Sequence, residues 1–172
     1  MSGDELKRFI ENWDREAQKT VRLLEALPTH QYDFRPWQDG RSLGELAWHL
    51  CEVEAYATFC IEAGKFGFEA KPPGLERPRE VKALAPGYAR VHGEALERVK
   101  RLQPEALDRK LGYFDGTPME VRDILRSELL YHLIHHRGQL VTMTRLAGGT
   151  PPGLFGPNRE AWLAMMAKMP GK

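Results

Sequence analysis

The sequence predicts an all-α fold, an up-down four-helix bundle with one long crossover and a short fifth helix near the C-terminal end. Four long segments place apolar residues three and four positions apart, as one face of a helix requires. No segment sustains the two-residue alternation of a half-buried strand, so we expect essentially no sheet. The chain has 172 residues, 42% of them apolar, which suits one domain over residues 1–172.

The first two helices have clear ends in the sequence. Apolar residues follow helical spacing from Leu6 to Leu27, and Pro28 stops the pattern, which predicts a helix over residues 4–27. Ser42 and Glu45 then stand three positions apart, ahead of an apolar run. This spacing is typical of a capping box, in which the two side chains satisfy free amides of the first turn. We therefore expect a second helix from this point to about residue 63.

The third helix comes after a long connection. Residues 64–78 include Lys-Pro-Pro-Gly at positions 71–74, which cannot continue a helix. Apolar spacing resumes over residues 80–102 and predicts the third helix there. Pro86 and Gly87 fall within it, and we expect them to kink the helix or to delay its start.

The fourth helix is expected to be the longest. Thr117 and Glu120 form a second capping-box pattern, with Pro118 at the first helical position, and no helix breaker follows before Gly148. We therefore predict a helix from this box to the residues just before Gly148. A short amphipathic segment over residues 158–169 predicts the fifth helix.

Composition argues against several classes of protein. The chain has 25 Lys and Arg against 24 Asp and Glu, so it offers no basic field for nucleic acid. No apolar run approaches the ~20 residues that cross a bilayer, and the acidic N-terminal segment is unlike a signal peptide. We expect a cytoplasmic protein with no membrane partner. Cys51 and Cys60, nine positions apart on one helix, would lie ~13 Å apart and cannot pair.

Two histidines of the fourth helix carry the strongest functional signal. His132 and His136 are one turn apart, so their imidazoles can converge on one ion. Their face of the helix is otherwise mostly apolar, and a polar group there is costly unless it is paired or coordinated. The same spacing also arises by chance, and buried histidines often bond only to protein. A metal site therefore needs a third ligand, for which His49 on the second helix is the natural candidate.

Other polar residues near these histidines have smaller roles to fill. Glu128 and Gln139 lie in the same stripe and are the candidate catalytic residues, although a solvated or capping role is equally open to Gln139. Glu45, Glu52 and Glu128 could each orient a ligating ring, and for Glu52 we favour a solvated charge. His135 is turned by ~60° from His132 and is expected to border the site. His30 and His92 fall on other segments, without a partner that the sequence identifies. The loops over residues 28–41 and 64–79 are expected to frame the pocket.

These segments together resemble a known family. Residues 132–140, with Asp-Gly-Thr-Pro before them at 115–118 and Leu-Ala-Gly-Gly after them at 146–149, look like the end of a DinB/YfiT-like domain. Residues 42–50 are similar to that family's second helix. The resemblance implies an up-down four-helix bundle, commonly dimeric, in which three histidines hold a divalent metal such as zinc or nickel. Those positions correspond here to His49, His132 and His136.

The resemblance also implies a class of chemistry. Family activities include thiol S-transfer and a thiol-dependent isomerisation, so we expect a low-molecular-weight thiol as a cosubstrate. Three neutral imidazoles would leave a divalent ion with its full charge and an open position, which favours deprotonation of a thiol or of water. S-transfer to a small molecule is the favoured hypothesis, and hydrolysis is second. The alternative is a non-catalytic stress-response bundle that binds a metal or a small ligand.

A second apolar stripe predicts an interface. Leu130, Ile134 and Val141 lie nearly opposite the histidines on the fourth helix. A helix that is apolar on two sides is buried on both. The fifth helix or a second subunit must then cover this stripe, and we favour a homodimer.

Overall fold

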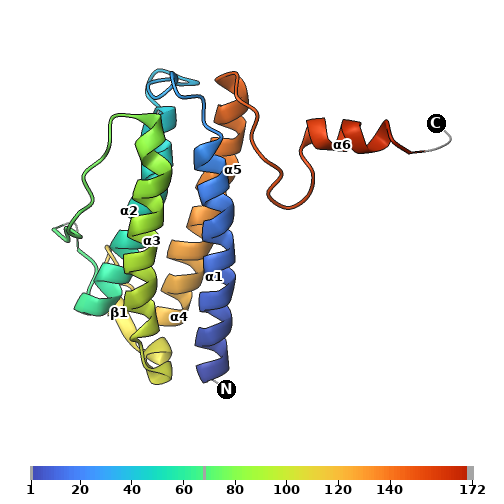
Figure 1. Ribbon diagram of the computed structural model, residues 1–172. Coiled ribbons are helices and arrows are strands. Elements are labelled where there is room, and N and C mark those ends of the chain that lie inside the picture. The colour runs from blue at the N-terminus through green and yellow to red at the C-terminus, as the bar shows by residue number, and fades with distance from the viewer. Residues whose placement is uncertain (1, 68, 170–172) are drawn as a thin grey trace.

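Four long helices form the body of the computed structural model, which describes residues 2–67 and 69–169 (Figure 1). They are α1 (Ser2–Glu25), α2 (Leu43–Ala63), α3 (Leu84–Lys100) and a last helix made of α4 (Val121–Asp123), a π-helical segment (Ile124–Tyr131) and α5 (His132–Leu146). Helix α2 packs against α3 and α5, and α1 packs against α3. The crossover after α2 returns the chain to the other end of the bundle, so α2 and α3 run in the same direction (Figure 1). The predicted all-α bundle with a long crossover is confirmed.

The start of α2 follows the prediction closely. The Ser42 hydroxyl accepts a hydrogen bond from the Glu45 N–H at 3.2 Å, and the Glu45 carboxylate accepts one from the Ser42 N–H at 2.8 Å. This capping box fixes the start of α2. The helix ends at Gly64, whose φ is 81°. At α3, a 3₁₀ turn (Val81–Ala83) precedes the helix, and Pro86 falls in its first turn. A missing N–H is harmless there, so the proline delays the helix without breaking it.

The structure contains a small hairpin where essentially no sheet was expected, and the prediction of the second capping box was wrong. Strands β1 (Lys110–Gly112) and β2 (Pro118–Glu120) pair antiparallel, with Leu111 opposite Met119. The Asp115 carboxylate accepts from the Thr117 N–H at 2.9 Å, which closes the turn between them. The last helix therefore begins at Val121 without a side-chain cap. Three-residue strands are too short to show alternation, and the Thr-Pro-Met-Glu segment has the spacing of a capping box with proline at the first helical position.

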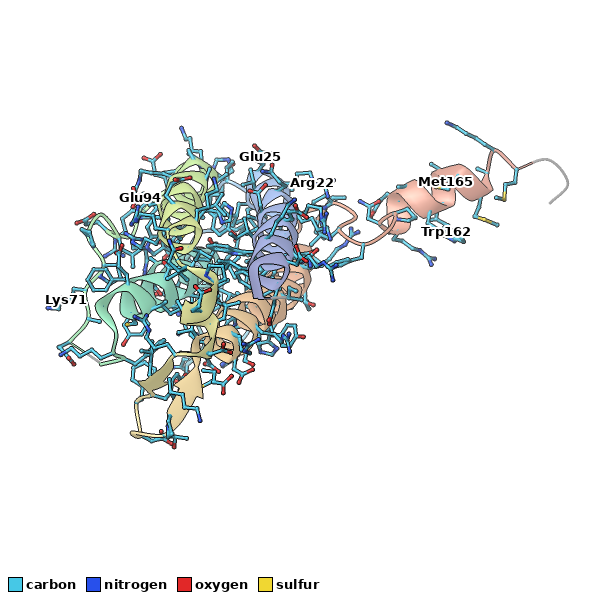
Figure 2. All side chains as sticks on the ribbon, turned by 90° about the horizontal axis from the view of Figure 1, so that it is seen from below. Arg22, Glu25, Lys71, Glu94, Trp162 and Met165 are labelled. Carbon is cyan, nitrogen blue, oxygen red and sulfur yellow. The ribbon has the colours of Figure 1, made fainter. Side chains whose placement is uncertain are left out.

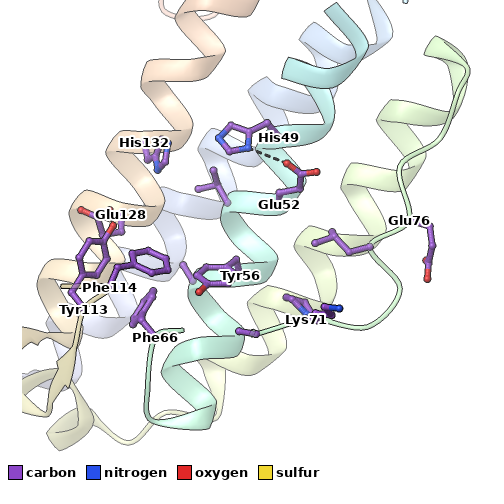
Figure 3. Close-up of a pocket in the computed structure, with 15 residues that line it drawn as sticks. His49, Glu52, Tyr56, Phe66, Lys71, Glu76, Tyr113, Phe114, Glu128 and His132 are labelled. Atoms are coloured by element: carbon purple, nitrogen blue, oxygen red, sulfur yellow. Dashed lines mark hydrogen bonds and ion pairs between the residues drawn. The ribbon is translucent and has the colours of Figure 1, made fainter. Parts of the chain in front are cut away.

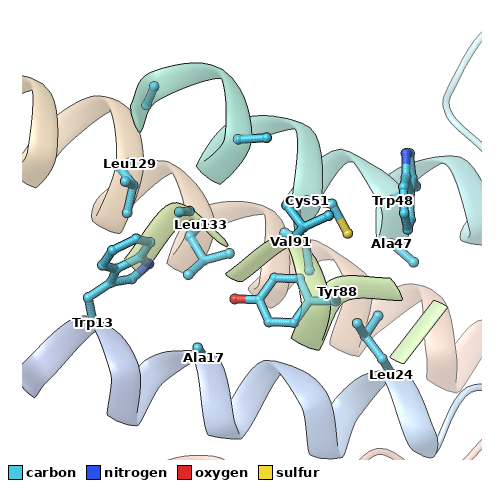
Figure 4. Close-up of a cluster of buried hydrophobic side chains, with 14 of the residues drawn as sticks. Trp13, Ala17, Leu24, Ala47, Trp48, Cys51, Tyr88, Val91, Leu129 and Leu133 are labelled. Carbon is cyan, nitrogen blue, oxygen red and sulfur yellow. The ribbon is translucent and has the colours of Figure 1, made fainter. Parts of the chain in front are cut away.

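The core lies between the four long helices, and each of them contributes to it (Figure 4). Trp13 from α1, Trp48 from α2, Tyr88 from α3 and Leu133 from α5 are all at most 2% exposed. Within this apolar interior Glu54 is fully buried and accepts hydrogen bonds from Trp13, Tyr88 and His92. Both cysteines are buried and free, as their spacing predicted.

The C-terminal helix α6 (Arg159–Met166) stands away from the bundle (Figures 1 and 2). It has no buried residue, and Trp162, Leu163 and Met165 are each about half exposed. An ion pair between Arg145 and Glu160 at 2.6 Å ties its first turn to α5. Helix α6 therefore does not cover the second apolar stripe, which remains partly buried. Among the described residues, no helix combines the length and the apolar character that crossing a bilayer needs.

Candidate metal centre

Three histidines from two neighbouring helices meet at one point. His49 comes from the second turn of α2, and His132 and His136 come from the first two turns of α5, against which α2 packs. One ring nitrogen of each histidine lies within 4.8 Å of the other two. The ring centroids are 4.7 to 5.6 Å apart. The structure therefore brings together the three residues that the sequence selected as a ligand set.

Protein oxygens hold the rings of His49 and His136, and the ring of His132 faces that of His136 through a nitrogen. His49 Nδ1 lies 3.0 Å from a carboxylate oxygen of Glu52, and His136 Nδ1 lies 2.7 Å from Oε1 of Gln139. A nitrogen that donates to such an oxygen fixes the ring tautomer and leaves the lone pair on Nε2. The Nε2 atoms of His132 and His136 face each other at 2.8 Å. Ligating histidines are commonly oriented in this way.

The ionisation of the rings suits cation binding. Burial, together with the nearby His49 charge, lowers the pKa of His132. Burial also lowers the pKa of His136 to about 4, with His49 and His132 adding to the effect. Imidazoles that stay neutral at neutral pH are ligands, and two lone pairs 2.8 Å apart repel unless a proton or a cation lies between them. The donor set therefore fits a divalent cation.

The glutamates near the rings differ from their predicted roles. The preference for Glu52 as a solvated charge was wrong, because Glu52 bonds to His49 and also pairs with Arg77 at 3.4 Å. Burial alone would raise the pKa of Glu52, but His49 and Arg77 outweigh it and lower that pKa. Glu45 touches no ligating ring. Its pairing with Arg35 at 2.8 Å and its capping bond lower its pKa to about 2.

The two candidate catalytic residues lie on different sides of the histidines. Glu128 lines the large cavity beside His132 and accepts a hydrogen bond from the Tyr113 hydroxyl at 2.6 Å. Gln139 is exposed, and its amide nitrogen lies 3.2 Å from the exposed His135 ring. Gln139 and His136 line a smaller cavity of about 420 Å³, which the predicted loop over residues 28–41 frames. Of the two candidates, Glu128 is the one that faces the large cavity.

The large cavity has a volume of about 680 Å³ and runs along α2 from His49 and His132 (Figure 3). Volumes of this size hold a small organic molecule. At the end away from the histidines its wall is aromatic and consists of four side chains, Tyr56, Phe66, Tyr113 and Phe114 (Figure 3). Sequence reasoning did not predict this aromatic wall. The available signal was the aromatic pair placed directly before the Asp-Gly turn at positions 115–116.

The crossover over residues 64–80 forms the outer wall of this cavity, as predicted, and side chains of the bundle hold it by its carbonyl groups. Tyr56 donates to the Gly67 carbonyl at 2.5 Å, and Trp48 donates to the Leu75 carbonyl at 3.3 Å. Tyr32 donates to the Pro78 carbonyl at 2.6 Å. Hydrogen bonds from buried or rigid side chains keep a long loop in one conformation. The cavity is therefore formed before any ligand arrives.

Sequence comparison decides the family. The DinB superfamily model matches residues 12–140, a span that includes all three histidines. The chain belongs to the DinB superfamily. The resemblance to DinB/YfiT-like domains is thereby confirmed. A curated relative of this DinB-superfamily chain, the uncharacterized protein YrdA of Bacillus subtilis strain 168, is 27% identical over 157 residues. That alignment covers 91% of this chain and 92% of the relative.

Solved structures of DinB-like proteins share the fold. A DinB-like protein from Bacillus cereus ATCC 10987 is 27% identical, with a TM-score of 0.68 over 84% of this chain and 94% of that one. The DinB-like protein YjoA of Bacillus subtilis is 23% identical, with a TM-score of 0.68 over 86% of this chain and 97% of that one. The bundle described above is therefore the fold of the superfamily.

Proposed function

We propose that this DinB-superfamily chain is a metal-dependent enzyme whose His49, His132 and His136 hold one divalent cation. The observation that supports this most is the convergence of three ring nitrogens within 4.8 Å beside a cavity of about 680 Å³. Zinc and nickel are the first candidates because the resemblance to DinB-like domains implies them, and imidazole ligands suit both as well as copper and iron. A closed structural site would use a fourth protein ligand, whereas a cation held by these three histidines would keep at least one position free for a ligand.

The proposed reaction is transfer of a low-molecular-weight thiol to a small electrophile, with hydrolysis second. A divalent ion held by three neutral imidazoles supplies a positive charge that lowers the pKa of a thiol or of water. The residues of the chain then have separate tasks. Glu52 and Gln139 orient the rings of His49 and His136 through the hydrogen bonds described above.

Glu128 is the proposed proton acceptor. Its carboxylate lines the cavity next to His132, and the hydroxyl of Tyr113 donates to one of its oxygens. A proton released by a thiol or by water in the cavity would pass to this carboxylate. General bases act from within hydrogen-bond reach of the proton that they accept, and a cavity-facing carboxylate meets that condition.

The proposal is tested by metal analysis of protein purified without a histidine tag, followed by a screen of thiol conjugation and hydrolysis. We expect about one divalent ion per chain and turnover that depends on it. His132→Ala should lose both while keeping its helical circular dichroism. His135→Ala is the matched control, because it removes an imidazole one turn away that lies outside the ligand set, and it should keep both.

Two other outcomes would change the conclusion. Bound metal without turnover of any thiol or hydrolysable substrate would favour the alternative, a bundle that binds metal or a small ligand without catalysis. Absence of divalent metal under all loading conditions would overturn the proposal.

We also propose that the protein acts as a homodimer in the cytoplasm. The support for a dimer is the exposed apolar surface of α6 and the second apolar stripe, which α6 leaves uncovered. Two free cysteines are typical of a reducing compartment.

A further inference from the structure

The wall of the large cavity away from the histidines is a compact group of rings, which we call the aromatic wall: Tyr56, Phe66, Tyr113 and Phe114. Neighbouring ring centroids in it are 4.8 to 5.9 Å apart. The two phenol groups are already bonded, that of Tyr56 to a carbonyl and that of Tyr113 to Glu128. Burial, with weaker effects from neighbouring groups, raises the pKa of both phenols, that of Tyr56 to about 12. The wall therefore presents uncharged ring surface to a ligand.

The charged groups of the cavity are unevenly distributed. Among the described residues that line it, the carboxylates are Glu52, Glu76 and Glu128, and Lys71 is the one Lys or Arg side chain. Lys71 and Glu76 are both exposed on the crossover, so their charges are screened and of opposite sign. Glu52 and Glu128 lie deeper, beside the histidines, and are partly buried. Glu52 is paired with Arg77 at 3.4 Å, so it is Glu128 that leaves the inner end negative when no metal ion is bound.

Without a metal ion, an anionic ligand would find, among the described lining residues, only the exposed and screened charge of Lys71 to compensate its own charge in this cavity. It would lose its hydration against ring surface and approach carboxylates, which is unfavourable in a partly buried site. An uncharged ligand avoids this desolvation cost and this repulsion. A cation is attracted both by the carboxylates and by the ring faces. A flat apolar body fits the aromatic wall because rings stack or meet edge to face at these spacings.

We infer that the cavity takes an aromatic or similarly flat apolar small molecule whose head group is neutral or positively charged, and that it rejects anions. In the proposed reaction this molecule is the electrophile that receives the thiol. That role rests on the proposed function, whereas the chemistry of the ligand follows from the cavity itself.

The test uses three probes of equal size, namely benzylamine, benzyl alcohol and benzoate. Their binding to chelator-treated protein is measured by ligand-observed NMR and calorimetry, so that no probe can bind through a metal ion. We expect benzylamine to bind most tightly, and to bind about tenfold more tightly than benzoate, since one charge of the wrong sign near a partly buried carboxylate costs at least that factor. Benzyl alcohol should fall between them.

Two variants test the contribution of the aromatic wall and that of the carboxylate charge separately. Phe66→Ala should weaken all three probes about fivefold or more, because a buried ring contact is lost. Glu128→Gln should reduce the difference between benzylamine and benzoate to about twofold or less, since it removes one carboxylate charge. Phe155→Ala is the control, because Phe155 is 71% exposed on the C-terminal segment and does not line the cavity. It should leave all three affinities unchanged.

The inference is overturned if wild-type protein binds none of the probes, if benzoate binds as tightly as benzylamine, or if folded Phe66→Ala binds like wild type. Its failure is distinct from failure of the proposed function. If the protein never takes up metal but binds the probes in the expected order, this inference stands and the proposed function fails. If the protein binds metal and turns over thiol but does not bind the probes in the expected order, the proposed function stands and this inference fails. His132→Ala should rank them as wild type does.

Discussion

At the scale of single residues, the geometry of the candidate metal centre depends on the group that hydrogen-bonds to each imidazole. His49 is oriented by a carboxylate on its own helix, and His136 by an amide oxygen on its own helix. Both partners stand three positions after the histidine, so one turn of helix supplies a ligand and the group that orients it. The sequence named Gln139 for this neighbourhood, but it favoured a solvated charge for Glu52. Glu45 and Glu52 share the helix face of His49, and spacing alone does not show which of them bonds to the ring.

Glu52→Ala should lower the affinity for Zn²⁺ roughly tenfold to a hundredfold without unfolding the protein. Loss of the carboxylate frees the His49 ring and lowers its basicity, and groups that orient ligands typically carry this much affinity. Competition titration with a zinc chelator measures the change. Glu76→Ala removes a carboxylate from the mouth of the same cavity, away from the rings, and should bind zinc like wild type. Equal loss in both variants would mean that charge alone is responsible.

A second set of residues shows where single-residue reasoning failed. The sequence offered no partner for His92, yet its Nδ1 lies 2.8 Å from Glu54 and its Nε2 lies 3.2 Å from Asp14. Burial lowers the pKa of His92, but the hydrogen bonds and charges of Glu54 and Asp14 outweigh burial and raise that pKa. Partners 38 and 78 positions away are set by helix packing, and spacing along one helix does not reveal them.

The raised pKa of His92 makes folding stability depend on pH. A histidine with a higher pKa in the folded state stabilises fully below its ordinary pKa of 6.5, and the contribution disappears as pH rises through the folded value. The free energy of unfolding of wild-type protein should therefore fall as the pH rises above about 6.5 and through the raised pKa of His92. Urea titration at each pH measures it. His92→Gln should show a clearly smaller fall, and a parallel fall in both proteins would assign the effect to other groups.

At the scale of elements, the sequence predicted helices better than it predicted their starts. The Ser42 and Thr117 patterns are alike in the sequence, but the Ser42 pattern caps a helix and the Thr117 pattern belongs to a hairpin. The difference arises because Asp115 and Gly116 precede Thr117 and close a turn, with Gly116 at a φ of 83°. The hairpin also places Tyr113 and Phe114 at the cavity. Because the sequence did not predict the hairpin, it did not predict this half of the aromatic wall.

Ser42→Ala should destabilise the protein by about 1 kcal/mol, because it removes the cap of α2 from a buried position. Thr117→Ala should cost less than about 0.5 kcal/mol, because Thr117 is exposed and caps no helix. Thermal and urea unfolding of the two variants compare the sites directly. A larger loss for Thr117→Ala would contradict the hairpin assignment.

At the scale of the whole molecule, the sequence predicted the bundle, the crossover and the three histidines that meet. It did so because apolar spacing and capping reflect local physics, and because the face of the second helix offered His49 as a third ligand, a choice that the resemblance supported. The placement of α6 is different. Helix α6 has eight residues and no buried side chain, and helices so short are marginal in water. Its apolar residues predict a contact that the single chain does not make.

We expect the protein to be a dimer in solution and Trp162→Glu to shift it toward the monomer. The reason is that Trp162, Leu163 and Met165 are each about half exposed on one short helix, and exposed apolar side chains that gather on one element mark interaction sites. Light scattering over a concentration series measures the mass. Lys168→Glu changes charge just after the same helix but keeps its apolar area, so it should remain dimeric. A wild-type monomer at all concentrations would refute this prediction.

The separation between helices and connections has a consequence for how such proteins diversify. The three clustered histidines stand on packed helices, whereas Phe66, Tyr113 and Phe114 stand on the crossover and the hairpin turn. Connections accept insertions and substitutions that a packed helix does not. Descendants of one ancestor can thus exchange the molecules that they accept while inheriting the same reactive centre, and a laboratory library confined to residues 64–80 and 113–117 would follow that natural route.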